Sequence, residues 1–146
     1  MNIAPYLRLT YHPAGRDWPA VDCWGLYRLI VGENFGVWLG EFSGLEDPRA
    51  IARTAMREST SRDWLPVLPG AEQAGDAVLM TGLLGEGRLT LSAPIHVGCV
   101  IEPGRMIDIE ATNGVLVRNF RSTSRLRAAL EVANRVRGIF RPRALA

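Results

Sequence analysis

Apolar positions change their spacing near the middle of the chain. In the first half they recur at helical spacing, and the dipeptide Asp47-Pro48 combines an N-cap with a proline suited to a first helical turn. After residue 75 they follow the spacing of strands. The expected helices cover 22–31, ended by Gly32 and Gly36, then 49–61 and 124–136; the expected strands cover 76–80, 96–101, 106–109, 115–118 and 138–141.

The remaining segments are expected to connect these elements. Residues 1–20 indicate a short N-terminal arm and loop, and residues 64–75 a loop with two prolines. Turns at 102–104 and 112–114 join successive strands, which predicts an antiparallel meander. Helices followed by such a meander indicate an α+β fold, and 146 residues suit a single domain over 1–146. The hairpin at 82–94 is long, and it either shapes a cleft or touches a neighbour.

Composition excludes several classes of protein. Apolar residues make up 47% and charged residues 22% of the chain, which is typical of a globular domain. No apolar run reaches the ~18 residues of a membrane span, and the N-terminus lacks the features of a signal peptide. Two cysteines and two histidines cannot form a disulfide framework, and their spacing does not favour a zinc site. We therefore expect no metal and no cofactor.

Positive charge is concentrated at the C-terminal end. All 17 basic residues are arginine, and eight of them lie in 118–146 against the single acid Glu131, which gives this segment a charge of +7. The rest of the chain carries 9 arginines against 14 acids, or −5. The segment is either a solvated surface or a docking surface for an acidic partner. No nucleic-acid-binding motif accompanies the arginines, so nucleic acid is not an expected partner.

Cys23 is the candidate nucleophile. With Asp22 as N-cap, it lies in the first turn of a helix, where unpaired N–H groups favour a thiolate. His96 begins a strand and is the candidate base, and Asp108 on the next strand could orient the imidazole, with Glu110 as a spare on the same face. A buried core cysteine and a structural histidine remain the alternative interpretation of these positions. Cys99, inside a strand, is expected to be buried.

The motifs resemble those of a known family. Asp22-Cys23-Trp24-Gly25-Leu26, followed far downstream by His96-Val97-Gly98, is similar to the NlpC-type cell-wall cysteine peptidases of the papain-like superfamily. Tyr11 precedes the cysteine by twelve residues, as a tyrosine does in that family, and residues 73–79 resemble the family's Gly-Asp strand. The ending at 137–142 resembles the subgroup found in tail modules of long-tailed phages and gene transfer agents.

The resemblance implies a fold and a mechanism. It implies a papain-like, NlpC-type fold in which Cys23 attacks an amide carbonyl, His96 transfers the proton and Asp108 orients His96. The Tyr11 hydroxyl and the Cys23 backbone N–H would stabilise the oxyanion. The family most often has histidine, less often asparagine or glutamine, at the third position, so Asp108 departs from the pattern. An aspartate orients the imidazole in serine triads, so this departure does not exclude activity.

The resemblance also implies a substrate and a location. The expected substrate is a stem or crosslink peptide of bacterial peptidoglycan. The expected location is the tail tip of a virion or phage-like particle made in the host cytoplasm, where the enzyme opens the cell wall during DNA delivery. The expected partners are other tail-tip or hub proteins, bound through 118–146. Two alternatives are a structural tail-tip or tail-assembly protein with weak or no activity, and an amidase or acyltransferase of the same fold.

Overall fold

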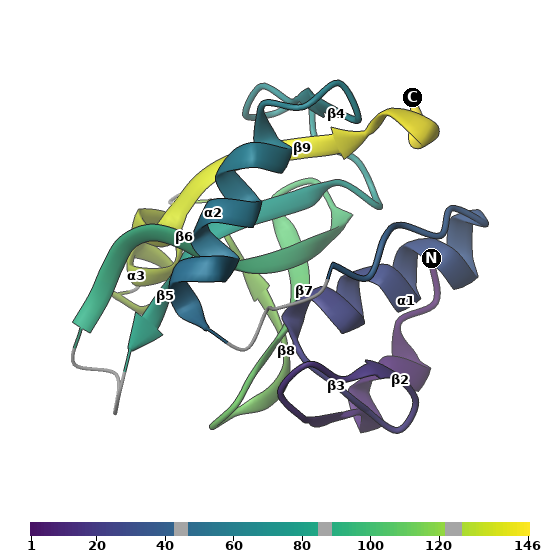
Figure 1. Ribbon diagram of the computed structural model, residues 1–146, viewed down its shortest axis with the longest axis horizontal. Helices are drawn as coiled ribbons and strands as arrows, with labels where there is room; N and C mark the ends of the chain where they lie inside the picture. The colour runs from purple at the N-terminus through teal and green to yellow at the C-terminus, as the bar shows by residue number, and fades with distance from the viewer. Residues whose placement is uncertain (43–46, 85–88, 122–126) are drawn as a thin grey trace.

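The computed structural model describes residues 1–42, 47–84, 89–121 and 127–146 (Figure 1). Side chains within 83–94 and 122–130 lie outside this description. None of the helices in the described ranges is long and apolar enough to cross a membrane. The elements run in the order η1 (Ala4–Arg8), β1 (Thr10–Tyr11), β2 (Arg16–Asp17), β3 (Ala20–Val21), α1 (Cys23–Phe35), α2 (Pro48–Ser59), β4 (Trp64–Pro66), β5 (Ala77–Leu84), β6 (Leu89–Glu102), β7 (Arg105–Glu110), β8 (Gly114–Asn119), α3 (Arg127–Arg135), β9 (Val136–Pro142) and η2 (Arg143–Leu145).

A six-stranded antiparallel sheet forms the centre of the molecule. Its strand order is β4-β9-β5-β6-β7-β8, so the meander expected from the alternating pattern spans β5 to β8. The last strand, β9, returns to pair with β5, and β4 pairs with β9. Helix α1 packs on β6 and β7, α2 on β6 and β4, and α3 on β8 and β5. The α+β prediction is confirmed, with helices before an antiparallel sheet.

Two segments expected to lack regular structure contain strands. The 64–75 loop begins with β4, in which Leu65 pairs with Arg141 of the last strand. Within the first 20 residues, β1, β2 and part of β3 belong to a small sheet in which β1 is parallel to β3. In both cases each strand is only two or three residues long. Such strands leave no periodicity for local patterns to detect.

The first helix is longer than predicted. Gly32 does not end α1; it lies against the Trp38 ring, where a β-carbon would collide with the indole. The helix continues to Phe35 and ends at Gly36, which adopts the left-handed conformation with φ of 70°. Gly32 therefore allows the Trp38 ring to pack closely against α1, and Gly36 forms the C-cap of the helix.

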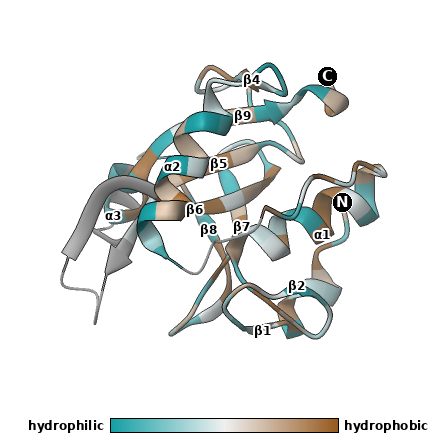
Figure 2. Cartoon of the chain, in the orientation of Figure 1, coloured by the Kyte–Doolittle hydropathy of each residue, from teal (hydrophilic) through white to brown (hydrophobic). Residues whose placement is uncertain are grey.

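Helix α2 begins and ends near its predicted bounds, and α3 ends near its predicted end. Asp47 caps α2 by accepting a hydrogen bond from the Arg49 N–H at 3.1 Å, and hydrophilic and hydrophobic residues are mixed along this helix (Figure 2). Helix α3 is described from Arg127, so the predicted start at 124 lies outside the described residues. Strand β9 follows at once from Val136, earlier than the predicted 138.

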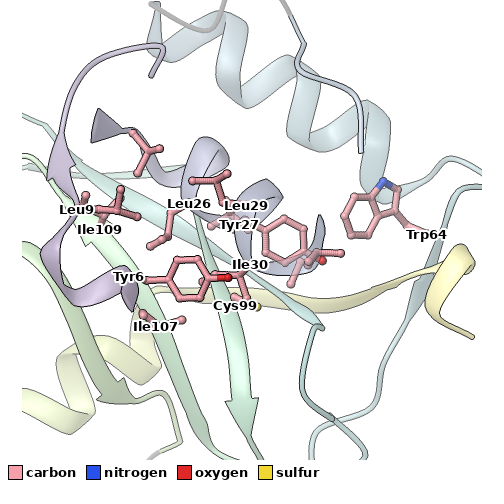
Figure 3. Packing of buried hydrophobic residues seen from close by; sticks show 14 residues of the cluster. Tyr6, Leu9, Leu26, Tyr27, Leu29, Ile30, Trp64, Cys99, Ile107 and Ile109 are labelled. Carbon is pink, nitrogen blue, oxygen red and sulfur yellow. The ribbon is translucent and has the colours of Figure 1, made fainter. Parts of the chain in front are cut away.

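Buried apolar residues pack on both faces of the sheet. On one face, α1 contributes Leu26 and Ile30 to a cluster with Cys99 and Ile107 (Figure 3). Cys99 is 1% exposed, and burial raises the pKa of its thiol well above the usual range, so it is a core residue as predicted. A second cluster contains Val78, Met80, Val100, Met106, Phe120 and Ile139. Successive residues of β6, such as Cys99 and Val100, belong to different clusters, as the pleat of a strand requires.

Candidate active site

The candidate nucleophile begins helix α1. Asp22 has extended backbone geometry, and its Oδ1 accepts a hydrogen bond from the Gly25 N–H at 2.8 Å, which makes Asp22 the N-cap. Arg16 Nη1 lies 2.6 Å from the same carboxylate oxygen and ties the loop before β3 to the cap. A β-carbon at Gly25 would collide with the carbonyl oxygen of Gly15, so glycine lets this loop lie directly on the helix. Cys23 is therefore held at a rigid helix start and remains partly exposed.

Cys23, His96 and Asp108 lie together. His96 Nε2 is 2.7 Å from Asp108 Oδ2, and Cys23 is close enough to the imidazole to raise its pKa. Because Nε2 faces the carboxylate, Nδ1 is the nitrogen left for the thiol. Burial alone would lower the pKa of His96, but the hydrogen bonds and negative charges of Asp108 and Cys23 raise it to about 9. The arrangement favours an imidazolium at neutral pH, next to the side chain of Cys23.

Strand register brings the histidine and the aspartate into contact. Cys99 pairs with Ile107, so Gly98 faces Asp108, and His96 is a diagonal neighbour of Asp108. Because Gly98 has no side chain, nothing at that position separates the imidazole from the carboxylate. A β-carbon at Gly98 would lie 3.5 Å from the Asp108 β-carbon and 2.6 Å from Met106 Sδ. The glycine of the His96-Val97-Gly98 motif therefore has a steric role in the site.

Two arginines complete the surroundings of Asp108. Arg118 donates through Nε to Asp108 Oδ1 at 3.0 Å and through Nη2 to Oδ2 at 2.5 Å. The same Nη2 lies 2.8 Å from Glu110 Oε1, which also accepts a hydrogen bond from Arg135 Nη1 at 3.0 Å. Arg135 in turn donates through Nε to the Thr81 carbonyl oxygen at 3.0 Å. Two carboxylates and two guanidinium groups thus balance in charge behind the imidazole.

Glu110, the spare orienting residue, faces these arginines. Burial would raise the pKa of Glu110, but hydrogen bonds and charge from Arg118, with further hydrogen bonds from Asn113 and Arg135, lower it to about 2. The carboxylate is thus ionised and engaged by cations. Asp108, whose Oδ2 lies against the ring nitrogen, occupies the orienting position instead.

His96, Asp108 and Glu110 are residue types that can also bind a metal ion. One ligand atom from each of His96, Asp108 and Glu110 lies within 4.8 Å of the others. However, Arg118 and Arg135 supply two positive charges to these carboxylates. A divalent cation would have to displace a guanidinium group from a buried ion pair, which is costly. The donor set suits proton transfer, and we assign no metal to it.

Tyr11 lies at the edge of the site. Strand pairing places it opposite Val21, two residues before the nucleophile, and its side chain is 37% exposed. Partial burial, with the nearby Cys23 and Asp22, raises the pKa of its hydroxyl, which therefore stays protonated. The hydroxyl can act as a donor next to Cys23. The Cys23 backbone N–H lies in the first helical turn, where helical N–H groups have no carbonyl partner within the helix.

Sequence reasoning missed the role of the C-terminal arginines. It treated 118–146 as a solvated or docking surface, but four of its arginines bind carboxylates of this same chain, which corrects the solvated interpretation for these four. Docking of a partner on this segment stays a prediction. Since three of these carboxylates are buried, each needs a cation of its own. Arg137 and Arg143 bond backbone carbonyl oxygens instead. The pairs are Arg118 with Asp108 and Glu110, Arg121 with Glu72, Arg135 with Glu110, and Arg141 with Asp76.

The fold of this chain is similar to that of several solved structures. An NLPC/P60 family protein from Bacillus cereus matches 97% of this chain with a TM-score of 0.60 at 21% identity. An NLP/P60 family protein similar to lipoproteins, from Staphylococcus aureus, matches 94% with a TM-score of 0.59 at 18% identity. NlpC1 from Trichomonas vaginalis matches 96% with a TM-score of 0.57 at 13% identity. The chain has the NlpC/P60 fold.

The three solved structures are much longer than this chain. The chain spans only 37% to 41% of the length of these three structures, so it corresponds to one part of each. No protein-family model matches the sequence, and a search of curated proteins finds no match. The similarity therefore establishes the fold, while the chemistry depends on the residues described above.

Proposed function

We propose that the protein is a cysteine peptidase that hydrolyses amide bonds in peptides of bacterial peptidoglycan. The observation that carries this proposal is the 2.7 Å contact between His96 Nε2 and Asp108 Oδ2, with Cys23 near the imidazole. A nucleophile next to a base that a carboxylate orients is what acyl transfer requires.

The steps follow from the positions of these groups. The Cys23 thiolate adds to the carbonyl carbon, and the Cys23 N–H and the Tyr11 hydroxyl stabilise the oxyanion. The His96 imidazolium gives its proton to the amide nitrogen, the C–N bond breaks, and the amine leaves a thioester on Cys23. The neutral His96 then takes a proton from water as the water attacks the thioester, which releases the acid and restores the imidazolium–thiolate pair.

The substrate and the location are supported by likeness. The NlpC/P60 fold and the Asp22-Cys23-Trp24-Gly25 motif favour a cell-wall peptide as substrate. The resemblance of residues 137–142 to tail-module sequences favours a place at the tail tip of a phage-like particle. In that setting local hydrolysis opens the wall for DNA delivery. The delivery role requires the protein in purified particles; particles that lack it would contradict that role and leave the chemistry unaffected.

The direct test is release of soluble fragments with new free amines from purified sacculi. We expect release by the wild type and none by Cys23→Ala or His96→Gln. His12→Gln is the matched control, because His12 is exposed and its Nδ1 lies 2.8 Å from the carbonyl oxygen of Pro13, which is not a member of the triad. The proposal is overturned if the wild type releases nothing and Cys23 also resists alkylation at neutral pH. If Cys23 is alkylated rapidly and sacculi stay intact, only the assignment of substrate is wrong.

A further inference from the structure

A cavity of about 90 Å³ lies directly beside the nucleophile. Cys23 and His96 form part of its wall, and the rest comes from α2, the aromatic residues around Trp24, and strands β4, β5, β6 and β9. A group bonded to Cys23 Sγ would therefore lie at this cavity. Its lining decides what kind of acyl group the site accepts.

Helix α2 contributes an apolar face to the cavity. Ile51 and Ala55 are one turn apart on this helix, and both line the cavity while remaining partly exposed. None of the residues of α2 is buried, although the helix packs on β6 and β4. The apolar side of an amphipathic helix is normally covered by its neighbours. Here part of that side borders the open cavity.

Aromatic rings form a second wall. The Trp24 ring centroid lies 5.2 Å from that of Phe42 and 6.4 Å from that of Trp64. The polar atom of the Trp24 indole is already used, because Nε1 donates to the Gly40 carbonyl oxygen at 2.9 Å. Leu79 of β5 and Phe140 of β9 extend this surface.

Apart from Cys23 and His96, the polar side chains of the lining come from α2: Thr54, Glu58 and Ser59. Ser59 donates its hydroxyl to the Met56 carbonyl oxygen, and Glu58 lies 3.4 Å from Arg57. Among the described lining residues, His96 is the cationic group, and Asp108 already balances its charge. An anionic substrate group would therefore lie against apolar walls without a cation of its own, which is costly, so a charged substituent is disfavoured at this position.

We propose that this cavity binds a short aliphatic acyl group of the substrate, so that the enzyme prefers amides whose acyl residue has a small, uncharged side chain. The inference rests on the proposed function, because the acyl group occupies the cavity as a thioester of Cys23. The volume sets the size: a dry cavity of ~150 Å³ holds benzene. A cavity of about 90 Å³ suits a chain of three or four carbons.

The experiment uses p-nitrophenyl esters of acetate, butanoate, hexanoate, decanoate and hemisuccinate. In each case the Cys23 thiolate adds to the carbonyl carbon, p-nitrophenolate leaves, and water hydrolyses the resulting thioester. The rate with Cys23→Ala is subtracted. We expect kcat/KM to rise about fourfold for each buried methylene from acetate to butanoate, and then to stop rising with longer chains. The hemisuccinate, similar in length to butanoate but charged, should react roughly tenfold or more slowly than butanoate.

Two alanine-to-leucine variants of α2 test whether the acyl chain occupies the cavity. Ala55→Leu fills the cavity and should lower the butanoate-to-acetate ratio severalfold. Ala52→Leu makes the same change at a partly exposed position of α2 that does not line the cavity, and should leave the ratio unchanged. Equal rates for acetate and butanoate, a faster hemisuccinate, a rate that keeps rising to decanoate, or equal effects of the two variants would overturn the inference. If no ester reacts through Cys23, the proposed function itself fails, and the inference fails with it.

Discussion

Two buried carboxylates of this protein have nearly the same ion pair but different surroundings. Asp76 and Asp108 are both 0% exposed, and each is bound by an arginine from the C-terminal segment through Nε and Nη2. Arg141 lies 2.8 Å from both oxygens of Asp76, and Arg118 lies 3.0 and 2.5 Å from those of Asp108. The two arginine side chains are 21% and 20% exposed, respectively.

The third partner makes the difference. Asp76 accepts its further hydrogen bond from the Gln73 backbone N–H at 2.9 Å, so every contact of this pair holds one part of the chain to another. Asp108 accepts its further hydrogen bond from His96, which also contacts Cys23. A buried aspartate–arginine pair thus becomes part of the candidate active site when a histidine shares the carboxylate. The Asp76 pair provides an internal control for the Asp108 pair.

The largest expected effect separates the two aspartates. Asp108→Asn should lower kcat by about 10²- to 10⁴-fold, because a neutral amide neither stabilises the imidazolium nor holds its tautomer as a carboxylate does. Asp76→Asn should keep the activity per folded molecule. Asp76→Asn should lose about 3–5 kcal/mol of stability, because it leaves the partly buried Arg141 without its carboxylate, whereas Asp108→Asn should lose less, because Arg118 keeps its pair with Glu110. Turnover normalised to folded protein and urea unfolding provide the two measurements; equal losses of activity would remove the distinction.

Replacing each arginine by methionine tests whether Arg118 positions Asp108. Arg118→Met and Arg141→Met should cost a similar free energy of unfolding, again about 3–5 kcal/mol. Only Arg118→Met should also lower kcat, by roughly tenfold, with little change in KM, since this change acts through the orientation of His96 and not through substrate contacts. Arg118→Lys should recover part of the loss by restoring one charged donor. A kcat for Arg118→Met equal to that of Arg141→Met would show that the first arginine is structural only.

The pH dependence of activity should also distinguish the Asp108 pair from the Asp76 pair, with a smaller effect. The pKa of His96 is raised to about 9, so the imidazolium and the activity that depends on it should persist at neutral pH and decline as the pH rises through about 9. Asp108→Asn removes a charge that raises this pKa, so the decline should begin at a lower pH. Asp76→Asn should keep it near 9. An alkaline limb at the same pH in all three proteins would contradict the assignment of the limb to His96.

The smallest expected effect concerns stability in acid. The pKa of Glu110 is lowered from 4.5 to about 2, so its contribution to folding is present above pH 4.5 and is lost as the pH falls toward 2. Glu110→Gln should therefore flatten the acid loss of stability in this range, by on the order of 0.5 M in the urea midpoint. Glu102→Gln is the control, because its pair with Arg105 is exposed. Equal slopes for the two variants between pH 5 and 2.5 would contradict this assignment.

Short-range signals in the sequence predicted much of the fold and the core of the site. The N-cap at Asp22, the helix start at Asp47-Pro48 and the turn at 102–104 each depend on residues within a few positions of one another. The turn returns β7 alongside β6, so that Asp108 reaches His96 across a single hairpin. The steric role of Gly98 could also have been predicted from the sequence, because its position opposite Asp108 follows from the same hairpin.

Contacts between distant segments were decided by tertiary structure. Arg141 and Asp76 are 65 residues apart, and Arg135 and Glu110 are 25 apart. A run of arginines gives the same net charge whether its members face solvent or buried acids, so composition could not distinguish the two. The pairing of β4 with β9 and the apolar cavity between α2 and Cys23 likewise require the packed chain. The sequence by itself determined the helix start, the strands and the hairpin that present Cys23, His96 and Asp108, because backbone geometry and caps are local. Only the folded chain decided which cations neutralise the buried carboxylates and what the nucleophile faces, because both depend on segments that meet when the sheet closes.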